Sequence, residues 1–524
     1  MQGARADADR ASSKFAKLVG FLVLFAQVFA MQRSIIDYIA AHVRTSPDRA
    51  AIHFRDAQVS YGQLDQIVAR CRGALAARGV RPGERVALVM SDSPDMIAAI
   101  LAIMGMGAVA VPCSTLLPLE GLAYVFKDSE ARLVVVSPEH LENAKAAGAP
   151  QVVLGSDLQR ADPAPLGNFD RDTACLVLYT SGSTGQPKGA VHRHGHMPWT
   201  VESVARKVYD LQPDDRLFSV PRLFFAYGLG NSLSIPLGCG ASTILVNERP
   251  TPALVAAVFE KYRPTVFFGV PTVFRMLLEY ARQGNSFDAS SLKFAVSAGE
   301  VLPLATWHEW KALTGSEIVD TIGTTELLHA FIHNYRDRNR PGSSGVALDG
   351  YEVKLIDENG DSVQGAGRGL LHVRGGSAIP YYLNKPDKTA ETIRDGWIRT
   401  GDVYRRDEDG YYWFEGRSDD LFKCSGMWVS PGEVEDAVCR HPGVMEAAVI
   451  AAADATGGTI PAAYVLLRPG YAAGDALAAE IMAKAAESLP RFKRPQRIHF
   501  MTELPRTPTG KVQRFKLRQM AAAK

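Results

Sequence analysis

Short apolar runs alternate with longer amphipathic stretches through the first half of this chain, and this alternation constrains the fold more than any other feature of the sequence. Val86–Met90 and Arg132–Val136 are apolar runs of strand length. Between them, Pro94–Met106 carries apolar residues at helical spacing and precedes a third run at Gly107–Pro112. Such alternation predicts layered α/β structure around a mostly parallel sheet, here from Ile35 to about Val246.

The character of the chain changes twice in its second half. Thr265–Val270 and Lys293–Ser297 continue the strand-like runs, whereas residues 345–414 carry short runs separated by Asp, Asn and Gly, which predicts a small β-rich subdomain. After Arg417 the chain begins a further α+β domain of roughly a hundred residues. Its expected elements are a helix at 431–440, strands at 446–452 and 462–467, and a helix at 476–488.

Length and charge limit the classes of protein that fit. A chain of 524 residues exceeds what one hydrophobic core usually serves, so we expect a large domain over 31–418 and a small domain over 419–524. The 58 basic and 56 acidic side chains give a net charge of +2, which argues against a dedicated nucleic-acid binder. The six cysteines are scattered without a CxxC pair, which indicates a reducing compartment and neither a disulfide scaffold nor a zinc site.

The first 30 residues differ in pattern from the rest of the chain. Arg10, Lys14 and Lys17 precede the apolar run Leu18–Ala30, a pattern that imitates a signal peptide. The run is shorter than the roughly 20 residues that a membrane span needs. Because Met31 follows at once, we favour an upstream extension from a misplaced start, with a weak membrane anchor or a true signal as the alternative.

A polar, glycine-rich stretch, YTSGSTGQPKG, occupies Tyr179–Gly189 directly after the apolar run Cys175–Leu178. Its glycines permit conformations that turn successive N–H groups toward an anion, and its hydroxyls and Lys188 add donors and a positive charge. A Walker P-loop would require Ser or Thr after the lysine, but Gly189 follows it. The stretch predicts a cradle for nucleotide phosphates, against the alternative of an ordinary surface loop.

Three histidines follow that loop at alternating positions. His192, His194 and His196 imitate a metal-binding cluster. Because zinc sites need ligands in a closed arrangement, the alternating spacing favours a strand-like exit from the loop instead.

The glycine-rich stretch resembles the phosphate-loop signature of the adenylate-forming superfamily, which includes acyl-CoA and aryl-CoA synthetases, luciferases and the adenylation domains of peptide synthetases. Further segments match that family in the same order, between about Ile35 and Arg518. They are Ile322–Glu326 (IGTTE), Arg399–Asp402 (RTGD), Gly416–Asp420 (GRSDD) and Leu504–Lys511 (LPRTPTGK).

The resemblance implies a role for each matching residue. Glu326 would bind Mg²⁺ through oxygen, Thr325 would contact the α-phosphate, and Lys511 would reach between the substrate carboxylate and the α-phosphate. Asp402 and Arg417 would bind the ribose hydroxyls. The β- and γ-phosphates would be held by Thr180, Ser181, Gly182, Ser183, Thr184, Gly185 and Lys188. The rest of the ATP and AMP site would comprise Ser297, Ala298, Gly299, Glu300, Asp320, Ile322, Gly323 and Thr324.

The same resemblance implies a second reaction step. The small domain would rotate about Asp419 and turn Lys423–Gly432, with Ser425 and Gly426, toward a tunnel for the thiol of coenzyme A. A plain turn at Asp419 is the alternative.

Substrate choice is indicated by Leu223–Asn231 (LFFAYGLGN) and Thr325–Phe331, which are similar to segments of benzoate-type CoA ligases. Apolar pockets with a few directed polar groups suit small aromatic ligands. The candidate lining residues, each of which would otherwise be core packing, are Ala226, Tyr227, Gly228, Ile322 and His329.

Together these matches lead us to expect an ATP-dependent, Mg²⁺-requiring aryl-CoA ligase that converts benzoate, or a hydroxy or amino relative, through an acyl-adenylate to an aryl-CoA. A short- or medium-chain fatty acyl-CoA synthetase and a carrier-loading adenylation enzyme are the alternatives. An enzyme that uses ATP and coenzyme A is expected in the cytoplasm, without nucleic acid or membrane as a partner and as a monomer or homodimer.

Overall fold

The computed structural model describes residues 33–180, 186–454, 457–506 and 512–522. They form two compact units. The first runs to Phe268 and includes Thr324–Ala330 and Gly375–Thr389, and the second comprises Gly269–Gly323, Phe331–Arg374 and the chain from Ala390 onward. The expected extension 1–30 lies outside the described residues, and the expected domain boundary at Asp419, which lies within the second unit, stays a prediction.

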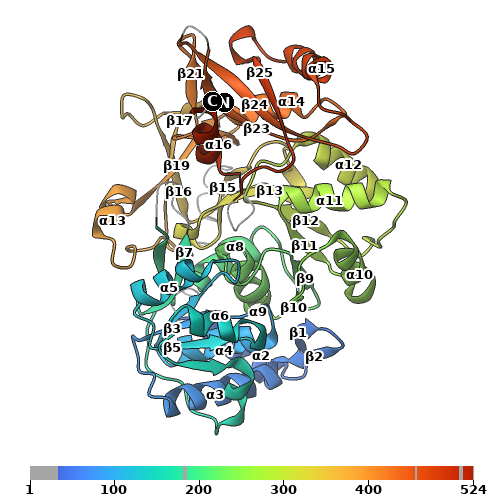
Figure 1. Ribbon diagram of the computed structural model, residues 1–524. Coiled ribbons are helices and arrows are strands. Elements are labelled where there is room, and N and C mark those ends of the chain that lie inside the picture. Colours follow the sequence, from blue (N-terminus) through green and yellow to red (C-terminus); the bar gives the residue numbers. More distant parts are fainter. Residues whose placement is uncertain (1–32, 181–185, 455–456, 507–511, 523–524) are drawn as a thin grey trace, which may run out of the picture. The chain divides into compact units, whose positions relative to one another are not determined.

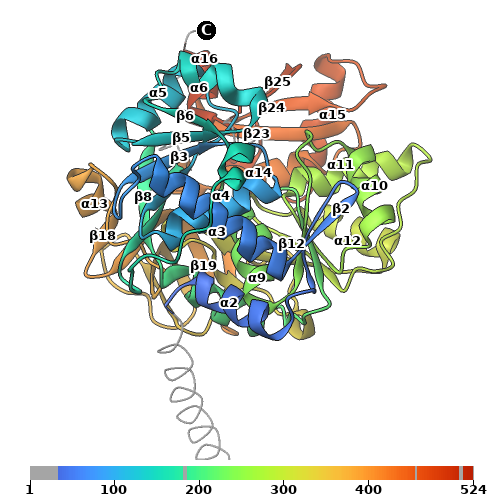
Figure 2. The same ribbon diagram turned by 90° about the horizontal axis from the view of Figure 1, so that it is seen from below.

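The first unit contains a six-stranded sheet in the order β6-β5-β3-β4-β7-β8, which is parallel except for the antiparallel pair β7–β8. Helices α5 and α6 cover one face, and α3 and α4 cover the other (Figure 2). The bounds are β3 (Arg85–Val89), β4 (Val109–Pro112), β5 (Leu133–Val136), β6 (Val152–Leu154), β7 (Ala174–Thr180), β8 (Lys188–Arg193), α3 (Tyr61–Ala77), α4 (Pro94–Gly105), α5 (Leu119–Asp128) and α6 (Leu141–Ala146).

Local sequence explains these elements well. Helix α4 begins where the Ser93 hydroxyl accepts a hydrogen bond from the Met96 amide and Pro94 occupies the first turn. Every residue of α4 from Met96 to Gly105 is buried, and all four residues of β4 and of β5 are buried as well. Buried parallel strands read as continuous apolar runs, so the α/β layering expected from the alternation is confirmed.

A second group of strands in the first unit has the order β11-β9-β10-β1-β2 (Figure 1). A helix that bears three of the predicted acyl-pocket residues, Ala226, Tyr227 and Gly228, passes from α8 through the π-helical turn η4 to α9. Such π turns are frequent at functional sites. The bounds are β1 (Ala50–Phe54), β2 (Ala57–Ser60), β9 (Arg216–Ser219), β10 (Ser242–Leu245), β11 (Val266–Gly269), α2 (Ile35–Thr45), α7 (His196–Thr200), η3 (Val201–Arg206), α8 (Ala226–Leu229), η4 (Gly230–Ser234), α9 (Ile235–Cys239) and α10 (Pro252–Tyr262).

The second unit begins with α/β elements and continues with the β-rich part expected at 345–414. In that part β19 pairs with β17, β18 and β20 in antiparallel fashion. The bounds are α11 (Pro271–Arg282), β12 (Phe294–Ser297), α12 (Leu304–Thr314), β13 (Ile318–Gly323), β14 (Ala330–His333), β15 (Val346–Ala347), β16 (Tyr351–Ile356), β17 (Gly367–Gly375), α13 (Pro386–Thr392), β18 (Ile393–Arg394), β19 (Trp397–Arg406) and β20 (Tyr412–Arg417).

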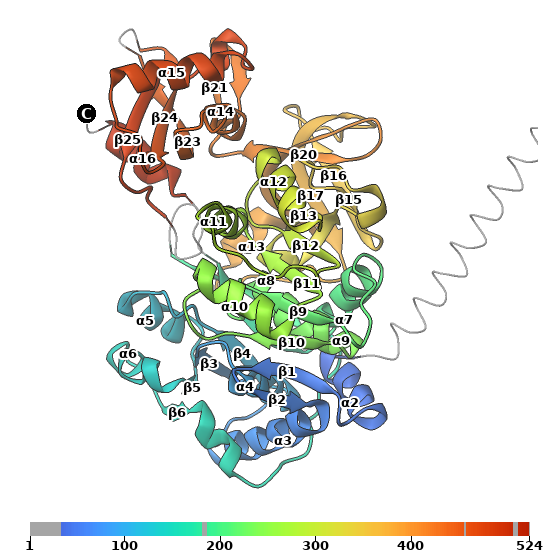
Figure 3. The same ribbon diagram turned by 90° about the vertical axis from the view of Figure 1, so that its right-hand side faces the viewer.

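The C-terminal part of the second unit is built on the sheet β23-β24-β25 (Figure 3). Residues of α14 and α15 share a hydrophobic core with one face of this sheet, and Leu517 of α16 packs with residues of the other face. The four elements expected here from sequence are all present. The bounds are β21 (Phe422–Cys424), β22 (Met427–Val429), α14 (Pro431–Val438), β23 (Val444–Ala453), β24 (Thr459–Leu467), α15 (Asp475–Ala486), β25 (Arg497–Met501) and α16 (Arg514–Ala522).

Among the helices of the described residues, none has the length and apolar character that crossing a lipid bilayer requires.

Candidate active site

The antiparallel hairpin β7–β8 brings the two ends of the predicted phosphate loop together. Thr180 at the end of β7 pairs with Lys188 at the start of β8, and Tyr179 pairs with Gly189. A Cβ atom at Gly189 would lie 2.7 Å from the Cγ1 atom of Val177, so this position has no room for a side chain. Five of the predicted phosphate ligands, Ser181, Gly182, Ser183, Thr184 and Gly185, lie outside the described residues.

The strand that leads into this loop is fixed by a buried carboxylate. Tyr179 donates a hydrogen bond of 2.7 Å from its hydroxyl to Asp128 at the end of α5. Asp128 also pairs with Lys385 at 3.3 Å, and its carbonyl oxygen accepts from the Asn384 side chain at 2.8 Å. The loop entrance is therefore held by a segment some 200 residues further along the chain.

The predicted metal ligand Glu326 lies in the short turn η5 (Thr325–Leu327) that follows Thr324. Three contacts hold this turn. The Ile379 amide donates to the Glu326 carbonyl at 2.9 Å, and the Ser377 hydroxyl donates to the Leu327 carbonyl at 2.8 Å. The third is a hydrogen bond of 2.9 Å between the His192 ring and the Thr325 carbonyl. The turn is thereby tied to β8 and to the segment around Ile379.

Lys188 and Glu326, predicted from two separate motifs, lie side by side in the first unit. Their Nζ and Oε1 atoms are 3.6 Å apart, and the exposed fractions of their side chains are 22% and 14%. Tyr382 lies between them: Lys188 donates to its hydroxyl at 2.8 Å, and that hydroxyl donates to Glu326 at 2.5 Å. We call Lys188, Tyr382 and Glu326 the phosphate cluster. The sequence did not single out Tyr382, since no motif quoted above includes it.

His192 supports the turn of Glu326 as a neutral ring. Burial lowers the pKa of His192 to about 4. Because the Thr325 carbonyl can only accept, Nε2 of His192 carries the proton, and its Nδ1 atom accepts from His196 Nδ1 at 3.0 Å. His192 lies in β8 and His194 bonds to Ser34 at 2.8 Å, and no group of three potential metal-ligating side chains occurs in the described parts of the chain.

Among the acyl-pocket candidates of the first unit, Tyr227 lies beside His329. The rings of Tyr227 and His329 lie 5.9 Å apart between centroids, and His329 Nε2 is 3.0 Å from the Asn231 side-chain oxygen in the π turn η4. A Cβ atom at Gly230 would lie 2.3 Å from the His329 ring, so a glycine is required for this approach. Ala226 and Gly228 are buried on α8.

The predicted ribose-binding residues meet in the second unit. Asp402 and Arg417 are directly opposite each other in the β19–β20 pair, with 2.9 Å between Arg417 Nη1 and Asp402 Oδ1. Arg417 also donates to the Thr400 carbonyl at 2.8 Å. Gly401 has φ of 78°, and a Cβ atom there would lie 2.7 Å from the Arg417 guanidinium. We call Asp402 and Arg417 the strand pair.

The remaining nucleotide-site candidates of the second unit follow two neighbouring parallel strands. Ser297 at the end of β12 pairs in register with Asp320 of β13, and both are buried. Burial raises the pKa of Asp320 well above its ordinary value. The turn Ala298–Glu300 follows β12 directly, with Gly299 at φ of 91°, and β13 ends in Ile322 and Gly323.

The candidates for the second reaction step lie around the short hairpin β21–β22. Ser425 and Gly426 form its two-residue turn with φ of 51° and 79°, as expected of a type I′ turn. Asp419 lies in the turn between β20 and β21. Lys511 lies outside the described residues, so its predicted role stays a prediction.

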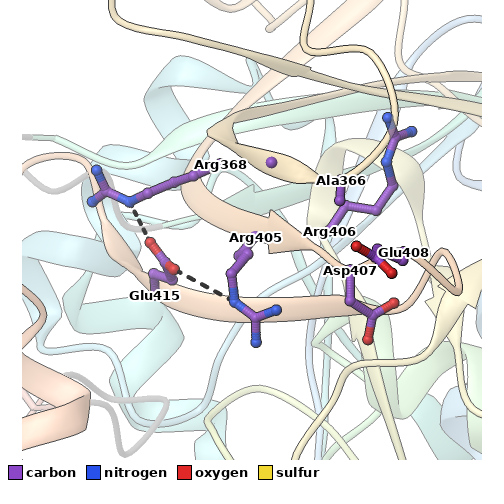
Figure 4. Close-up of a pocket in the computed structure, with 8 residues that line it drawn as sticks. Ala366, Arg368, Arg405, Arg406, Asp407, Glu408 and Glu415 are labelled. Carbon is purple, nitrogen blue, oxygen red and sulfur yellow. Dashed lines mark hydrogen bonds and ion pairs between the residues drawn. The ribbon is translucent and has the colours of Figure 1, made fainter.

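A surface pocket of about 430 Å³ opens in the β-rich part of the second unit (Figure 4). Glu415 pairs there with Arg368 and lies 4.0 Å from Arg405. The lining contains three arginines and three carboxylates and is therefore balanced in charge. It consists of Ala366, Gly367, Arg368, Arg405, Arg406, Asp407, Glu408 and Glu415, whereas the strand pair lies elsewhere on β19 and β20.

Two protein-family models match this chain, one after the other along the sequence. Residues 39–383 match the AMP-binding enzyme family, and residues 433–511 match the AMP-binding enzyme C-terminal domain. The chain is 38% identical to benzoate–CoA ligase of Thauera aromatica, over 92% of this chain and 95% of that protein. It is also 38% identical to 4-hydroxybenzoate–CoA/benzoate–CoA ligase of Rhodopseudomonas palustris, over 90% of each chain.

A solved structure of the same class of enzyme is also similar to this chain. A crystal structure of an anthranilate CoA ligase in complex with anthranoyl-AMP superposes with a TM-score of 0.89 and 35% identity, covering 94% of this chain and 99% of that one. The expected superfamily is thus confirmed, and with it the AMP-forming acid–thiol ligase class. With both domains matched in order and relatives aligned along nine-tenths of its length, this chain belongs to the AMP-binding enzyme family.

Proposed function

We propose that this protein activates benzoate, or a hydroxy- or amino-substituted benzoate, with ATP and transfers the aryl group to coenzyme A. The observation that carries this proposal is the phosphate cluster: Lys188 and Glu326, 138 residues apart in sequence, lie 3.6 Å apart in a chain related to aryl-CoA ligases. An ammonium group and a carboxylate side by side suit a substrate that arrives as a metal-bound triphosphate.

In the first step an oxygen of the aromatic carboxylate attacks the α-phosphorus of ATP, and pyrophosphate leaves. Phosphoryl and nucleotidyl transfers of this kind depend on positioning and on cations directed at developing charge. Lys188 would bind the outer phosphates, and Thr325 would donate to the α-phosphate. Lys511 would reach between the substrate carboxylate and the α-phosphate. Asp402 and Arg417 would orient the ribose.

Magnesium fits the oxygen chemistry of Glu326. Mg²⁺ is usually held by one or two carboxylates together with the phosphates of the nucleotide. A partly exposed carboxylate at the start of an ordered turn suits that role, since one side chain suffices on the protein side. Bound there, the ion would neutralise charge on the triphosphate.

The aromatic ring would lie against Tyr227 and His329, with Ala226, Gly228 and Ile322 as further lining. The contact between His329 and Asn231 holds the imidazole ring in one orientation. A fixed imidazole beside an aromatic ring would provide a polar contact for a hydroxyl or amino substituent.

In the second step the thiol of coenzyme A attacks the carbonyl carbon of the adenylate, and AMP leaves. We propose that Asp419 is the hinge of this step and that Ser425 and Gly426 face the thiol. Mg²⁺ as the metal and the cytoplasm as the location belong to the same proposal.

A panel that measures pyrophosphate release across aromatic and aliphatic acids, with and without coenzyme A, tests the function. We expect turnover with benzoate or its hydroxy and amino relatives and accumulation of free aryl-CoA without a partner protein. Preference for aliphatic acids would indicate a fatty acyl-CoA synthetase. Aryl transfer that requires a carrier's phosphopantetheine arm would indicate a carrier-loading enzyme, and absence of AMP with every acid would refute the proposal.

Replacing Lys511 separates the two steps. Lys511→Ala should abolish most adenylate formation but spare thioester formation from a supplied aryl-adenylate, because only the first step places charge between carboxylate and α-phosphate. Equal loss of both steps, measured as pyrophosphate release in the first and as AMP release from the supplied adenylate in the second, would contradict the assigned role.

A further inference from the structure

Tyr382 occupies a position in the phosphate cluster that the matched motifs do not explain. Its ring is 1% exposed, and the Lys188 ammonium lies 4.1 Å from the ring centroid. Its hydroxyl accepts from Lys188 and donates to Glu326 at the same time. A single hydroxyl thus satisfies a cation and an anion that are both assigned to the nucleotide.

The backbone around Tyr382 fixes where this hydroxyl lies. Tyr382 bridges to Ala190 of β8, and the Leu383 amide donates to the Gly189 carbonyl at 2.8 Å. On the other side, the Tyr382 amide donates to the Thr389 hydroxyl at 3.0 Å. The tyrosine is therefore anchored to the strand that begins with Lys188, and two residues of the same segment hold the turn of Glu326.

The Tyr382 hydroxyl determines which hydrogen bonds must break when the nucleotide binds. With 3.6 Å between Nζ and Oε1, the lysine and the glutamate are close enough to form a direct charge-assisted hydrogen bond if nothing else engages them. That bond would have to break before the lysine binds phosphate and the carboxylate binds the metal. Hydrogen bonds to a neutral hydroxyl are weaker than a direct bond between two ions, so they are exchanged at lower cost.

We propose that Tyr382 is a positioning residue that keeps Lys188 and Glu326 apart and directed toward an incoming complex of a divalent cation and ATP. It acts through these two side chains and not on the reacting atoms. The proposal rests on the proposed function, because that function assigns Lys188 to phosphate and Glu326 to the metal.

The test is Tyr382→Phe, with Tyr381→Phe as the matched control. Phenylalanine keeps the buried ring and removes only the hydroxyl, whereas the neighbouring Tyr381 side chain is 43% exposed. Calorimetry with α,β-methylene-ATP, in the presence and absence of Mg²⁺, measures binding without turnover. We expect Tyr382→Phe to weaken binding of the magnesium complex roughly tenfold, the size expected for hydrogen bonds to charged groups, and Tyr381→Phe to leave it unchanged.

Kinetics give the second measurement. The KM for magnesium–ATP should rise by a similar factor while kcat stays within about threefold, because the tyrosine prepares the site and takes no part in the transition state. In a Lys188→Ala background the same hydroxyl deletion should have a smaller effect on analogue binding, since one of the two partners is already absent.

Four results would overturn the proposal, three of them measured by binding. They are unchanged binding of the magnesium complex by Tyr382→Phe, equal weakening by Tyr381→Phe, and full additivity with Lys188→Ala. Loss of kcat alone with a lowered Tm would show a purely structural role and would also overturn it. If the parent protein bound the analogue but formed no AMP with any acid, the proposed function would fail while the binding comparison still decided the role of Tyr382.

Discussion

The phosphate cluster and the strand pair bring opposite charges together in two different ways. Asp402 and Arg417 are 15 residues apart and face each other because β19 and β20 pair in register. Lys188, Glu326 and Tyr382 come from three separate segments, and only tertiary contacts bring them together. The strand pair is thus a product of one antiparallel ladder, whereas the phosphate cluster depends on packing across its whole unit.

The two regions also differ in how the charges meet. Arg417 bonds directly to Asp402, and the approach requires a glycine at position 401. In the phosphate cluster a hydroxyl stands between the ions. This difference fits the roles proposed for them. The strand pair would orient a neutral ribose, whereas Lys188 and Glu326 would have to separate when a charged ligand binds.

The largest expected effect is on the phosphate cluster. Lys188→Ala should lower kcat/KM for adenylate formation by about 10²–10³-fold, because a cation directed at developing phosphate charge is lost. Pyrophosphate release with benzoate measures it. Arg193→Ala, at the other end of β8 and paired with Asp172, is the matched control and should be nearly neutral. Equal activity of the two variants would show that Lys188 has no catalytic role.

A smaller effect is expected in the strand pair. Arg417→Gln should raise the KM for ATP roughly tenfold with little change in kcat, because ribose contacts are made equally in ground and transition states. Arg405→Gln, a change of another partly exposed arginine on β19, is the control. A fall in kcat without any change in KM would show that the strand pair acts on the chemistry and would erase the contrast with the phosphate cluster.

The smallest effect concerns acid stability of the first unit. Burial lowers the pKa of His194 from 6.5 to about 4. Between these values the unfolded chain binds more protons than the native one, so stability is present above pH 6.5 and falls as pH drops toward 4. Because one pKa unit corresponds to about 1.4 kcal/mol, the loss of stability is on the order of 3 kcal/mol.

His194→Asn should therefore show a shallower fall of Tm than the parent protein between pH 6.5 and 4. The exposed His308 on α12 of the second unit supplies the control variant, His308→Asn, whose Tm profile should follow the parent's. Parallel profiles for all three proteins would show that acid does not act through this buried histidine.

Local patterns made much of this structure predictable. β3, α4 and β4 followed from the apolar runs and the helical spacing of Pro94–Met106, since these signals act within a few residues. Asp402 and Arg417 followed from family motifs, and their register then places them together. Tyr382 could not be found in this way, because its role arises from a bridge to β8 and a turn more than 50 residues away in sequence.

The position of Tyr382 along the chain has a consequence for synthesis. A nascent polypeptide that has left the ribosome as far as Glu326 already contains both ions of the phosphate cluster, but not the hydroxyl that separates them. The segment that ties Glu326 to β8 follows some 50 residues later. Binding of the metal–triphosphate end of the nucleotide is therefore expected to appear abruptly, once the chain has left the ribosome beyond about residue 389, whereas the proposed ribose contacts of Asp402 and Arg417 would follow later.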